Sequence, residues 1–182
     1  TAVVTGGTRG IGYAVVKKYL ENGAQVILFG SRKETVEKAL QKLKEENPDW
    51  PVEGAWPDLK DPEAVRAEIE RIHQKYRRID ILVNNAGISD SVPTIDFDPA
   101  HFDEVIGLNV NAIFHAVQPV VKIMKEQGGG CILNTSSMVS KFGQPSGVAY
   151  PASKFAVNGL TISLARELGP YQIRVNAVAP GV

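Results

Sequence analysis

The chain has 182 residues, of which 43% are hydrophobic and 22% are charged, and it has no net charge because 20 basic residues balance 20 acidic ones. This composition favours one folded domain over residues 1–182 and argues against disorder, while the missing basic excess argues against a nucleic-acid-binding protein. No apolar run approaches the roughly 18 residues that a membrane span needs. The single cysteine, Cys131, excludes an internal disulfide and is typical of a reducing compartment, so we expect a cytoplasmic protein.

Short runs rich in β-branched residues alternate with longer segments of helical periodicity. In chain order, the predicted strands are Ala2–Thr5, Gln25–Phe29, Val52–Trp56, Ile79–Val83, Cys131–Thr135 and Arg174–Val178. The predicted helices between them are Ile11–Glu21, Lys33–Glu46, Pro62–Tyr76, Phe102–Lys125 and Ala149–Leu168. This alternation predicts βαβ units and therefore an α/β protein, a three-layer αβα Rossmann fold with a doubly wound parallel sheet of six strands.

A glycine-rich turn joins the first predicted strand to the first predicted helix. It reads Thr5-Gly6-Gly7-Thr8-Arg9-Gly10-Ile11-Gly12, with the spacing G-x-x-x-G-x-G. Such a turn lets the backbone approach a pyrophosphate and points the first N–H groups of the helix at it. The absence of a following Gly-Lys-Ser/Thr excludes a P-loop. A turn that only requires positive φ is the alternative, but the density of glycines at this point favours dinucleotide binding.

Tyr150 and Lys154 lie one turn apart on the same face of the last predicted helix. The pKa of a free tyrosine is about 10, and a neighbouring ammonium lowers it toward the range useful for acid–base chemistry. Ser137 follows the fifth predicted strand, and it should meet Asn84 and Gly6 at the carboxyl edge of the sheet, where ligands of such folds bind. Taken singly, each residue has a structural alternative: a core tyrosine, a solvated lysine, or a serine in a turn.

These features, together with further motifs in the same order, resemble the fingerprint of the short-chain dehydrogenases/reductases over the whole chain. The motifs are Asn84-Asn85-Ala86-Gly87, Asn109, Ser137, Tyr150-x-x-x-Lys154 and Pro180-Gly181. The resemblance implies that Tyr150 donates a proton to a carbonyl oxygen, that Lys154 holds the nicotinamide ribose and tunes Tyr150, and that Ser137 polarises the substrate. Asn109 would hold a water that links Lys154 to solvent.

The resemblance also implies a set of cofactor-binding residues: Thr5, Gly6, Thr8, Arg9, Gly10, Ile11, Gly12, Ser31, Arg32, Asp58, Leu59, Asn85, Ala86, Gly87, Tyr150, Lys154, Pro180 and Gly181. Within this set, Asp58 matches the aspartate that binds the adenine amino group, although it could also be a turn residue before the helix that starts at Asp61-Pro62.

The end of the second predicted strand bears on the choice between NAD and NADP. An NAD site usually has an acidic residue there, whereas this chain reads Phe29-Gly30-Ser31-Arg32. Arg32, joined by Arg9 from the glycine turn, suits a 2′-phosphate because its planar fork binds phosphate bidentately. We therefore predict NADP rather than NAD. The alternative for Ser31 is a capping box, Ser31-x-x-Glu34, at the start of the second helix.

The predicted function is a hydride transfer between a nicotinamide cofactor and a ketone or secondary alcohol. Two groups of relatives compete: 3-oxoacyl-acyl-carrier-protein reductases and bacterial bile-acid hydroxysteroid dehydrogenases, so the expected substrate is a 3-oxoacyl thioester or a hydroxysteroid. Met138 and Phe142 favour an apolar ligand, and the stretches Gly128-Gly129-Gly130 and Tyr171-Gln172 lack the basic docking residues of the reductases. A non-catalytic NADP-binding sensor or scaffold is the alternative function.

The expected partners are a small carbonyl or alcohol substrate and copies of the same chain. The resemblance implies a homotetramer or homodimer formed through the long helices after the fourth and fifth strands. The three histidines show no ligand spacing, so no metal is expected, and neither is a nucleic acid or a membrane. The substrate lid, further helix and last parallel strand that the family has beyond Pro180-Gly181 are expected to be missing here, and with them a seventh strand.

Overall fold

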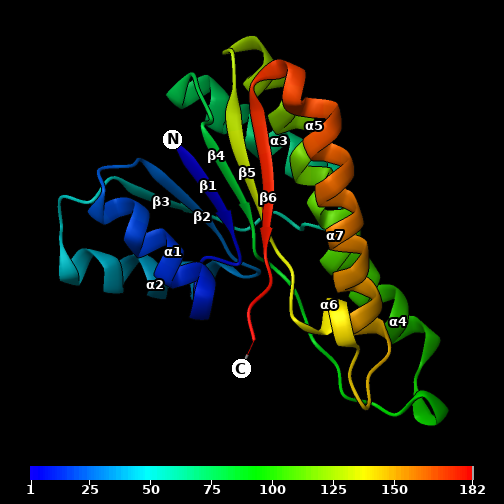
Figure 1. Ribbon diagram of the computed structural model, residues 1–182. Coiled ribbons are helices and arrows are strands. Elements are labelled where there is room, and N and C mark those ends of the chain that lie inside the picture. Colours follow the sequence, from blue (N-terminus) through cyan, green and yellow to red (C-terminus); the bar gives the residue numbers. More distant parts are fainter. Residues whose placement is uncertain (182) are drawn as a thin grey trace.

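A single sheet of six parallel strands organises the computed structural model, which describes residues 1–181 (Figure 1). The strands are β1 (Ala2–Thr5), β2 (Val26–Phe29), β3 (Val52–Ala55), β4 (Ile81–Asn84), β5 (Gly130–Thr135) and β6 (Ile173–Val178). Their order is β3-β2-β1-β4-β5-β6, and each neighbouring pair is parallel. The chain thus winds outward from β1 in one direction and from β4 in the other, which confirms the predicted doubly wound sheet.

Helices cover both faces of this sheet, as Figure 1 shows. One face is covered by α1 (Gly10–Glu21) and α2 (Lys33–Glu46), and the other by α3 (Pro62–Tyr76), α5 (Ala112–Glu126) and α7 (Ala149–Leu168). The two remaining α-helices, α4 (Pro99–Ile106) and α6 (Val139–Phe142), lie near the carboxyl ends of the strands (Figure 1). Short 3₁₀ turns occupy Thr94–Asp96 and Gly169–Tyr171.

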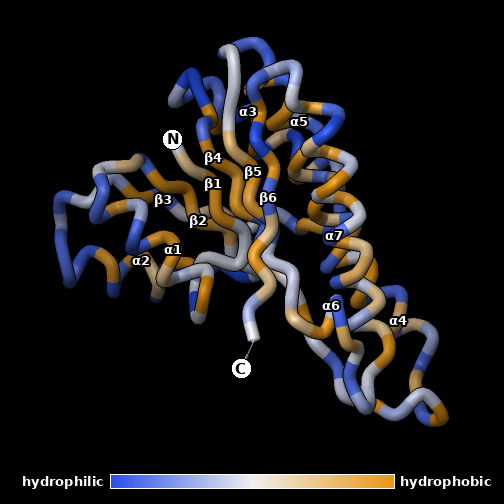
Figure 2. Tube along the Cα trace, viewed as in Figure 1, coloured by the Kyte–Doolittle hydropathy of each residue, from blue (hydrophilic) through white to orange (hydrophobic). Residues whose placement is uncertain are grey.

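The central strands read as continuous apolar runs because both of their faces are buried. In β1, Val3 packs into the core beneath α3, α5 and α7, whereas Ala2 and Val4 pack into the core beneath α1 and α2. Figure 2 shows the resulting pattern, with hydrophobic residues along the strands and the hydrophilic residues concentrated on outer turns. Among the described residues, no helix is long and apolar enough to cross a membrane.

The predicted helix Phe102–Lys125 is wrong in its extent. The helical segment begins earlier, at Pro99, where the Asp98 side chain accepts a hydrogen bond of 2.9 Å from the Ala100 N–H. A π-helical turn at Gly107–Asn111 then separates α4 from α5. Glycine and asparagine are poor helix formers, and long-range hydrogen bonds of Asn109, described below, hold the turn in place.

The capping box considered as the alternative for Ser31 does not form. Helix α2 begins at Lys33, its N-cap is Arg32, and no side chain there makes a capping hydrogen bond. By contrast, Asp61 does cap α3, since its carboxylate accepts a hydrogen bond of 2.9 Å from the Glu63 N–H and Pro62 occupies the first turn. Ser31 therefore lies exposed before the helix with no structural role in capping it.

Candidate active site

The carboxyl ends of β1 and β4 are tied together by the side chain of Thr5. Its hydroxyl accepts hydrogen bonds from the N–H groups of Asn85 at 3.0 Å and Ala86 at 3.1 Å. The Asn85 amide donates in turn to the carbonyl oxygens of Thr5 and Gly6, at 3.3 Å each. The predicted residues of the first turn and of the Asn-Asn-Ala-Gly motif are therefore brought together at the point where the strand order reverses, which is where ligands of such sheets bind.

The glycine turn forms a cradle that side chains would fill. Gly6 and Gly10 have φ angles of 65° and 54°, in the left-handed region. A Cβ on Gly12 would overlap the Gly6 carbonyl group, whose carbon would lie 2.8 Å away. Helix α1 starts at this turn with Arg9 as an N-cap that makes no side-chain hydrogen bond, so the positive end of the helix has no capping side chain. A dinucleotide pyrophosphate requires a backbone that it can approach closely and helix N–H groups that are free to bind it. The glycine turn offers both, so its residues fit a dinucleotide cofactor.

The glycine turn lies beside the end of β2. A Cβ built on Gly30 would come within 2.6 Å of the Thr8 side-chain methyl. The next residues, Ser31 and Arg32, are exposed, as is Arg9 in the turn. The glycine turn and the end of β2 together therefore present one hydroxyl and two guanidinium groups, and these three residues include no carboxylate. In folds of this kind, a nicotinamide dinucleotide places its adenosine ribose at this position.

Asp58 and Leu59 follow β3, as predicted. Asp58 is exposed, and one of its carboxylate oxygens closes a turn by accepting a hydrogen bond of 2.9 Å from the Lys60 N–H. The Leu59 carbonyl oxygen accepts a hydrogen bond of 2.9 Å from Nδ1 of His115 on α5. Asp58 thus has the turn role considered as its alternative, while its second oxygen remains at the surface.

Tyr150 and Lys154 lie in the first two turns of α7, and the ammonium of Lys154 is 5.5 Å from the centroid of the tyrosine ring. Lys154 is only 5% exposed, and its Nζ donates a hydrogen bond of 2.8 Å to the carbonyl oxygen of Thr135 at the end of β5. Burial, which disfavours the charged form, lowers the pKa of Lys154 to about 8. The buried ammonium therefore lies beside the phenol ring, in the first two turns of the same helix.

Two consecutive serines follow β5, and their hydroxyls have different surroundings. Ser136 donates a hydrogen bond of 2.7 Å to the Asn158 side chain on α7. Ser137 accepts a long hydrogen bond of 3.4 Å from the Val139 N–H, which leaves its own proton free to be donated. The structure therefore engages Ser136 in packing against α7 and leaves Ser137 able to contact a ligand oxygen.

Asn109 lies in the π-helical turn and is 1% exposed. Its Oδ1 accepts a hydrogen bond of 2.9 Å from the Ile88 N–H, and its Nδ2 donates to the Ile88 carbonyl at 2.8 Å and to Ser153 Oγ at 3.0 Å. Both side-chain N–H groups thus have protein partners. A Cβ on Gly87 would lie 3.0 Å from Asn109 Oδ1 and 3.8 Å from Lys154 Nζ, so these three residues meet at one point.

The last predicted pair lies beside the loop after β5. The carbonyl oxygen of Pro180 accepts a hydrogen bond of 3.0 Å from the Met138 N–H. A Cβ on Gly181 would approach the Met138 sulfur at 2.9 Å. The segments after β5 and β6 therefore form adjacent walls next to Ser137.

Three residues of this site escaped prediction: Thr135, Ser153 and Asp90. Thr135 accepts from Lys154, and Ser153 Oγ donates to the Tyr150 carbonyl oxygen at 2.7 Å. The Asp90 carboxylate accepts a hydrogen bond of 2.9 Å from the Tyr150 N–H. Ser153 could have been noticed because it lies within the Tyr150-x-x-x-Lys154 motif, whereas Asp90 carries no local signal.

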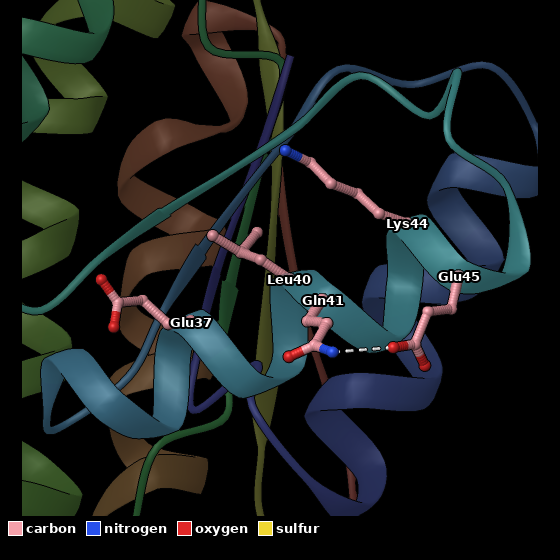
Figure 3. Close-up of a pocket in the computed structure, with 5 residues that line it drawn as sticks. All are labelled: Glu37, Leu40, Gln41, Lys44 and Glu45. Atoms are coloured by element: carbon pink, nitrogen blue, oxygen red, sulfur yellow. Dashed lines mark hydrogen bonds between the residues drawn. The ribbon is translucent and has the colours of Figure 1, made fainter.

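A shallow hollow elsewhere on the surface is separate from this constellation. It lies on α2 and is lined by Glu37, Leu40, Gln41, Lys44 and Glu45 (Figure 3). Among these residues, Gln41 Nε2 donates a hydrogen bond of 2.8 Å to Glu45 Oε1. Because α2 runs away from the carboxyl edge of the sheet, this hollow takes no part in the candidate active site.

Comparison with known proteins agrees with the geometry. A family model described as short chain dehydrogenase matches residues 1–182. The chain is 62% identical over 181 residues to a 3alpha-hydroxysteroid dehydrogenase of Mediterraneibacter gnavus, covering all of this chain and 72% of that protein. It is 35% identical over 181 residues to a 3-oxoacyl-acyl-carrier-protein reductase of Chlamydia trachomatis, covering all of this chain and 73% of that protein.

Solved structures show the same architecture. A metagenomic short-chain oxidoreductase in complex with NADP has a TM-score of 0.93 at 35% identity, with 100% of this chain and 81% of that one covered. An NAD⁺-bound xylitol dehydrogenase has a TM-score of 0.94 at 34% identity, with 99% of this chain and 69% of that one covered.

Proposed function

The chain belongs to the short-chain dehydrogenase family of nicotinamide-dependent oxidoreductases, which act on CH–OH and C=O groups, and from this premise we propose that it interconverts a hydroxysteroid and its ketone with NADPH as the preferred cofactor. The observation that carries the proposal is the constellation of Ser137, Tyr150 and the buried Lys154 at the carboxyl edge of the sheet.

Each residue has a defined role in the proposed reaction. During reduction, Tyr150 donates its phenolic proton to the substrate oxygen, and during oxidation the phenolate takes it back. The Lys154 ammonium favours the phenolate and offers hydrogen bonds to the cofactor ribose, while Ser137 donates a hydrogen bond to the substrate oxygen. The nicotinamide, when bound, supplies or accepts the hydride. Asn109 anchors the segment after β4 to α7 and so keeps Gly87 beside Lys154.

The proposed steroid substrate rests on similarity and on exposed apolar side chains. The hydroxysteroid dehydrogenase relative is 62% identical, far above the 34–37% of the 3-oxoacyl reductases. Met138, Phe142 and Val148 lie in the segment between Ser137 and Tyr150, which contains α6, and are 42%, 73% and 46% exposed. Exposed apolar groups at the mouth of a site favour a rigid apolar ligand. The stretch Gly128–Gly130 before and within β5 also offers no basic group for an acidic carrier protein.

The proposed preference for NADPH rests on the residues after β2. Ser31 is not engaged in capping α2, and Arg9 and Arg32 are exposed with side chains able to reach a ligand phosphate. The two solved relatives carry NADP and NAD⁺ at nearly equal identity, so they do not separate the two cofactors, and the proposal depends on this local chemistry.

The proposal also includes an oligomeric state and a cellular location. We place a homodimer or homotetramer contact on α5 and α7, where Phe114, Phe155 and Ile162 are 52%, 51% and 60% exposed. Residues 1–182 would act as one cofactor-binding domain, and the free thiol of Cys131 suits a cytoplasmic setting. A purely cofactor-binding role is less well supported, because it requires none of the proton-transfer residues.

The test is a substrate screen that follows NADPH absorbance. Steroid ketones, 3-oxoacyl thioesters and simple cyclic ketones are each offered with NADPH or NADH. We expect the highest kcat/KM with a steroid ketone and NADPH. Faster turnover of the thioesters would replace the steroid with an acyl substrate, and a preference for NADH would overturn the cofactor assignment. No turnover of any compound would favour the non-catalytic alternative.

A further inference from the structure

The N-terminus of α7, which carries Tyr150 and Lys154, has no cap from its own loop. Its N-cap residue is Val148, and no side chain of that loop makes a capping hydrogen bond. The Tyr150 N–H, one of the donors that a helix start leaves without an intrahelical partner, donates instead to Asp90 Oδ2 at 2.9 Å, across 60 residues of sequence. A carboxylate at this place also interacts favourably with the positive end of the helix dipole.

The segment around Asp90 is joined to the loop before α7 by two further contacts. Gln144 Nε2 donates to the Asp90 carbonyl at 3.0 Å, and Ser146 Oγ donates to the Ser91 carbonyl at 2.6 Å. Within the loop, Gln144 Nε2 also donates to the Gly147 carbonyl at 2.6 Å. In Figure 1 these are the green segment after β4 and the yellow to orange loop leading into α7. The two segments therefore form one unit.

Gly147 makes the close approach possible. Its φ is 85°, and a Cβ there would overlap both Asp90 Oδ1 and the Asp90 carbonyl oxygen, with Gln144 Nε2 2.5 Å away. Asp90 Oδ1 itself is buried and has no hydrogen-bond partner among the described residues. A buried unpaired oxygen is unfavourable for stability, which argues that the residue is used for more than folding.

The N–H and the carbonyl oxygen of Tyr150 are both connected to the segment that follows β4. Its N–H is held by Asp90, and its carbonyl oxygen accepts from Ser153 Oγ, which itself accepts from Asn109 Nδ2. Asn109 is fixed to the Ile88 N–H and carbonyl, two residues before Asp90. Through these contacts, Asp90 and Asn109 together fix the position of the first turn of α7 against the segment that follows β4.

We propose that Asp90 is a positioning residue that holds the Tyr150 peptide N–H and so keeps the phenol in register with Lys154 and Ser137. This rests on the proposed role of Tyr150 in proton transfer. Misplacement of a reacting group by about 1 Å lowers rates by roughly 10²-fold, so losing the clamp should act mainly on kcat. Cofactor affinity should change little, because Asp90 does not touch the glycine turn.

The test compares Asp90→Ala with Asp90→Asn, whose amide oxygen can still accept from the Tyr150 N–H. Asp98→Ala is the matched control, because Asp98 caps α4 in the same connection with a hydrogen bond of the same 2.9 Å but does not contact Tyr150. The measurements are kcat with the best substrate of the screen, the NADPH Kd by fluorescence and the melting temperature. We expect Asp90→Ala to lose at least about tenfold in kcat with an NADPH Kd within about twofold of the parent. Asp90→Asn should keep most of the activity, and Asp98→Ala should keep all of it.

Equal kcat in Asp90→Ala and the parent protein would overturn the proposal, and so would equal losses in Asp90→Ala and Asp98→Ala. Tyr150→Phe, measured in the same assays, distinguishes failure of the Asp90 proposal from failure of the proposed function. An inactive Tyr150→Phe with a fully active Asp90→Ala overturns only the clamp, whereas a fully active Tyr150→Phe overturns the proposed function and the clamp with it. If Asp90→Ala does not fold, Gln144→Ala loosens the same unit from its other side, and an unchanged kcat there would also overturn the clamp.

Discussion

Lys154 Nζ donates to the carbonyl oxygen of Thr135 at 2.8 Å, while the hydroxyl of the same threonine donates to Asn85 Oδ1 at 3.3 Å. Thr135 thereby links the buried ammonium to the motif that follows β4. An ammonium has three N–H donors, and Thr135 occupies one of them. The others can serve the substrate side of the site and the cofactor ribose, so the charge state of Lys154 should govern ligand binding.

The affinity for NADPH should therefore fall above pH 8. Burial lowers the pKa of Lys154 to about 8, so the free protein loses this cation as the pH rises through that value. We expect the NADPH Kd, measured by fluorescence between pH 7 and about 9.5, to rise several-fold. In Lys154→Arg, whose guanidinium stays charged in this range, the Kd should be nearly constant. A constant Kd in the parent protein would contradict the assignment.

Lys154 should also lower the stability of the protein without cofactor. Its folded-state pKa of about 8 lies below the ordinary value of 10.5, so between these values the unfolded chain binds more protons and stability rises with pH. Below pH 8 the full penalty of burying the cation applies. Lys154→Met should then raise the free energy of unfolding at pH 7 by on the order of 1–2 kcal/mol, less than the shift alone implies because Thr135 loses a donor. The gain should shrink toward pH 10, and denaturant titrations at both pH values would show whether it does.

Tyr150→Phe removes only the phenolic hydroxyl. We expect kcat to fall by about 10²–10⁴-fold while NADPH still binds, because general acid–base catalysis contributes on this scale. Tyr171→Phe is the matched control, since Tyr171 is 40% exposed and stacks under Lys125 far from α7's first turn. The measurements are steady-state kinetics and NADPH titrations of both variants. Near-normal turnover in Tyr150→Phe would refute the role of Tyr150 as proton donor.

Arg32→Ala should weaken NADPH selectively. If its guanidinium binds the 2′-phosphate, kcat/KM with NADPH should fall by about tenfold or more while the value with NADH stays within about twofold. Lys38 is an exposed cation within α2, and Lys38→Ala should affect the kinetics with neither cofactor. Equal losses with NADPH and NADH in Arg32→Ala would place the arginine outside the phosphate site.

Gly12→Ala and Gly10→Ala should differ sharply although both lie in the same turn. A Cβ at Gly10 meets nothing within 4 Å, so the cost is the backbone strain of its positive φ, about 1 kcal/mol. A Cβ at Gly12 would overlap the Gly6 carbonyl group, which cannot move as a side chain could. We expect Gly12→Ala to lose more than about tenfold in NADPH affinity, because this overlap would displace the backbone that binds the pyrophosphate. Similar affinities of the two variants would contradict the cradle.

The regular elements could be predicted because their signals are local. The predicted bounds of β1, α2, α3 and α7 match those observed, since apolar periodicity and the Asp61-Pro62 start depend only on neighbouring residues. The break at Gly107–Asn111 could not be read in this way, because hydrogen bonds from Asn109 to Ile88 and Ser153 hold it. The Ser31-x-x-Glu34 pattern does not form a capping box because α2 starts at Lys33, one residue later than that pattern requires, with Arg32 as its N-cap.

In the candidate site, too, residues within a local motif could be predicted, whereas contacts between distant segments could not. Tyr150, Lys154 and Ser137 could be named because their spacing lies within a motif and its flanks. The different roles of Ser136 and Ser137 depend on Asn158 across the interface with α7, and the contact from Asp90 spans 60 residues. Such contacts are set by the packing of separate segments, which a single sequence does not display.

The π-helical turn at Gly107–Asn111 also sets the rotational phase between two helices. Helix α4 packs against α7, while α5 packs against α3, so each needs a different side turned inward. An α-helix advances about 100° per residue, and removing one residue from the turn would swing one helix by that angle against the other. Either Asn109 would leave Ile88 or the apolar face of α5 would turn toward water. This segment should therefore tolerate substitutions at its exposed positions far better than any change in its length.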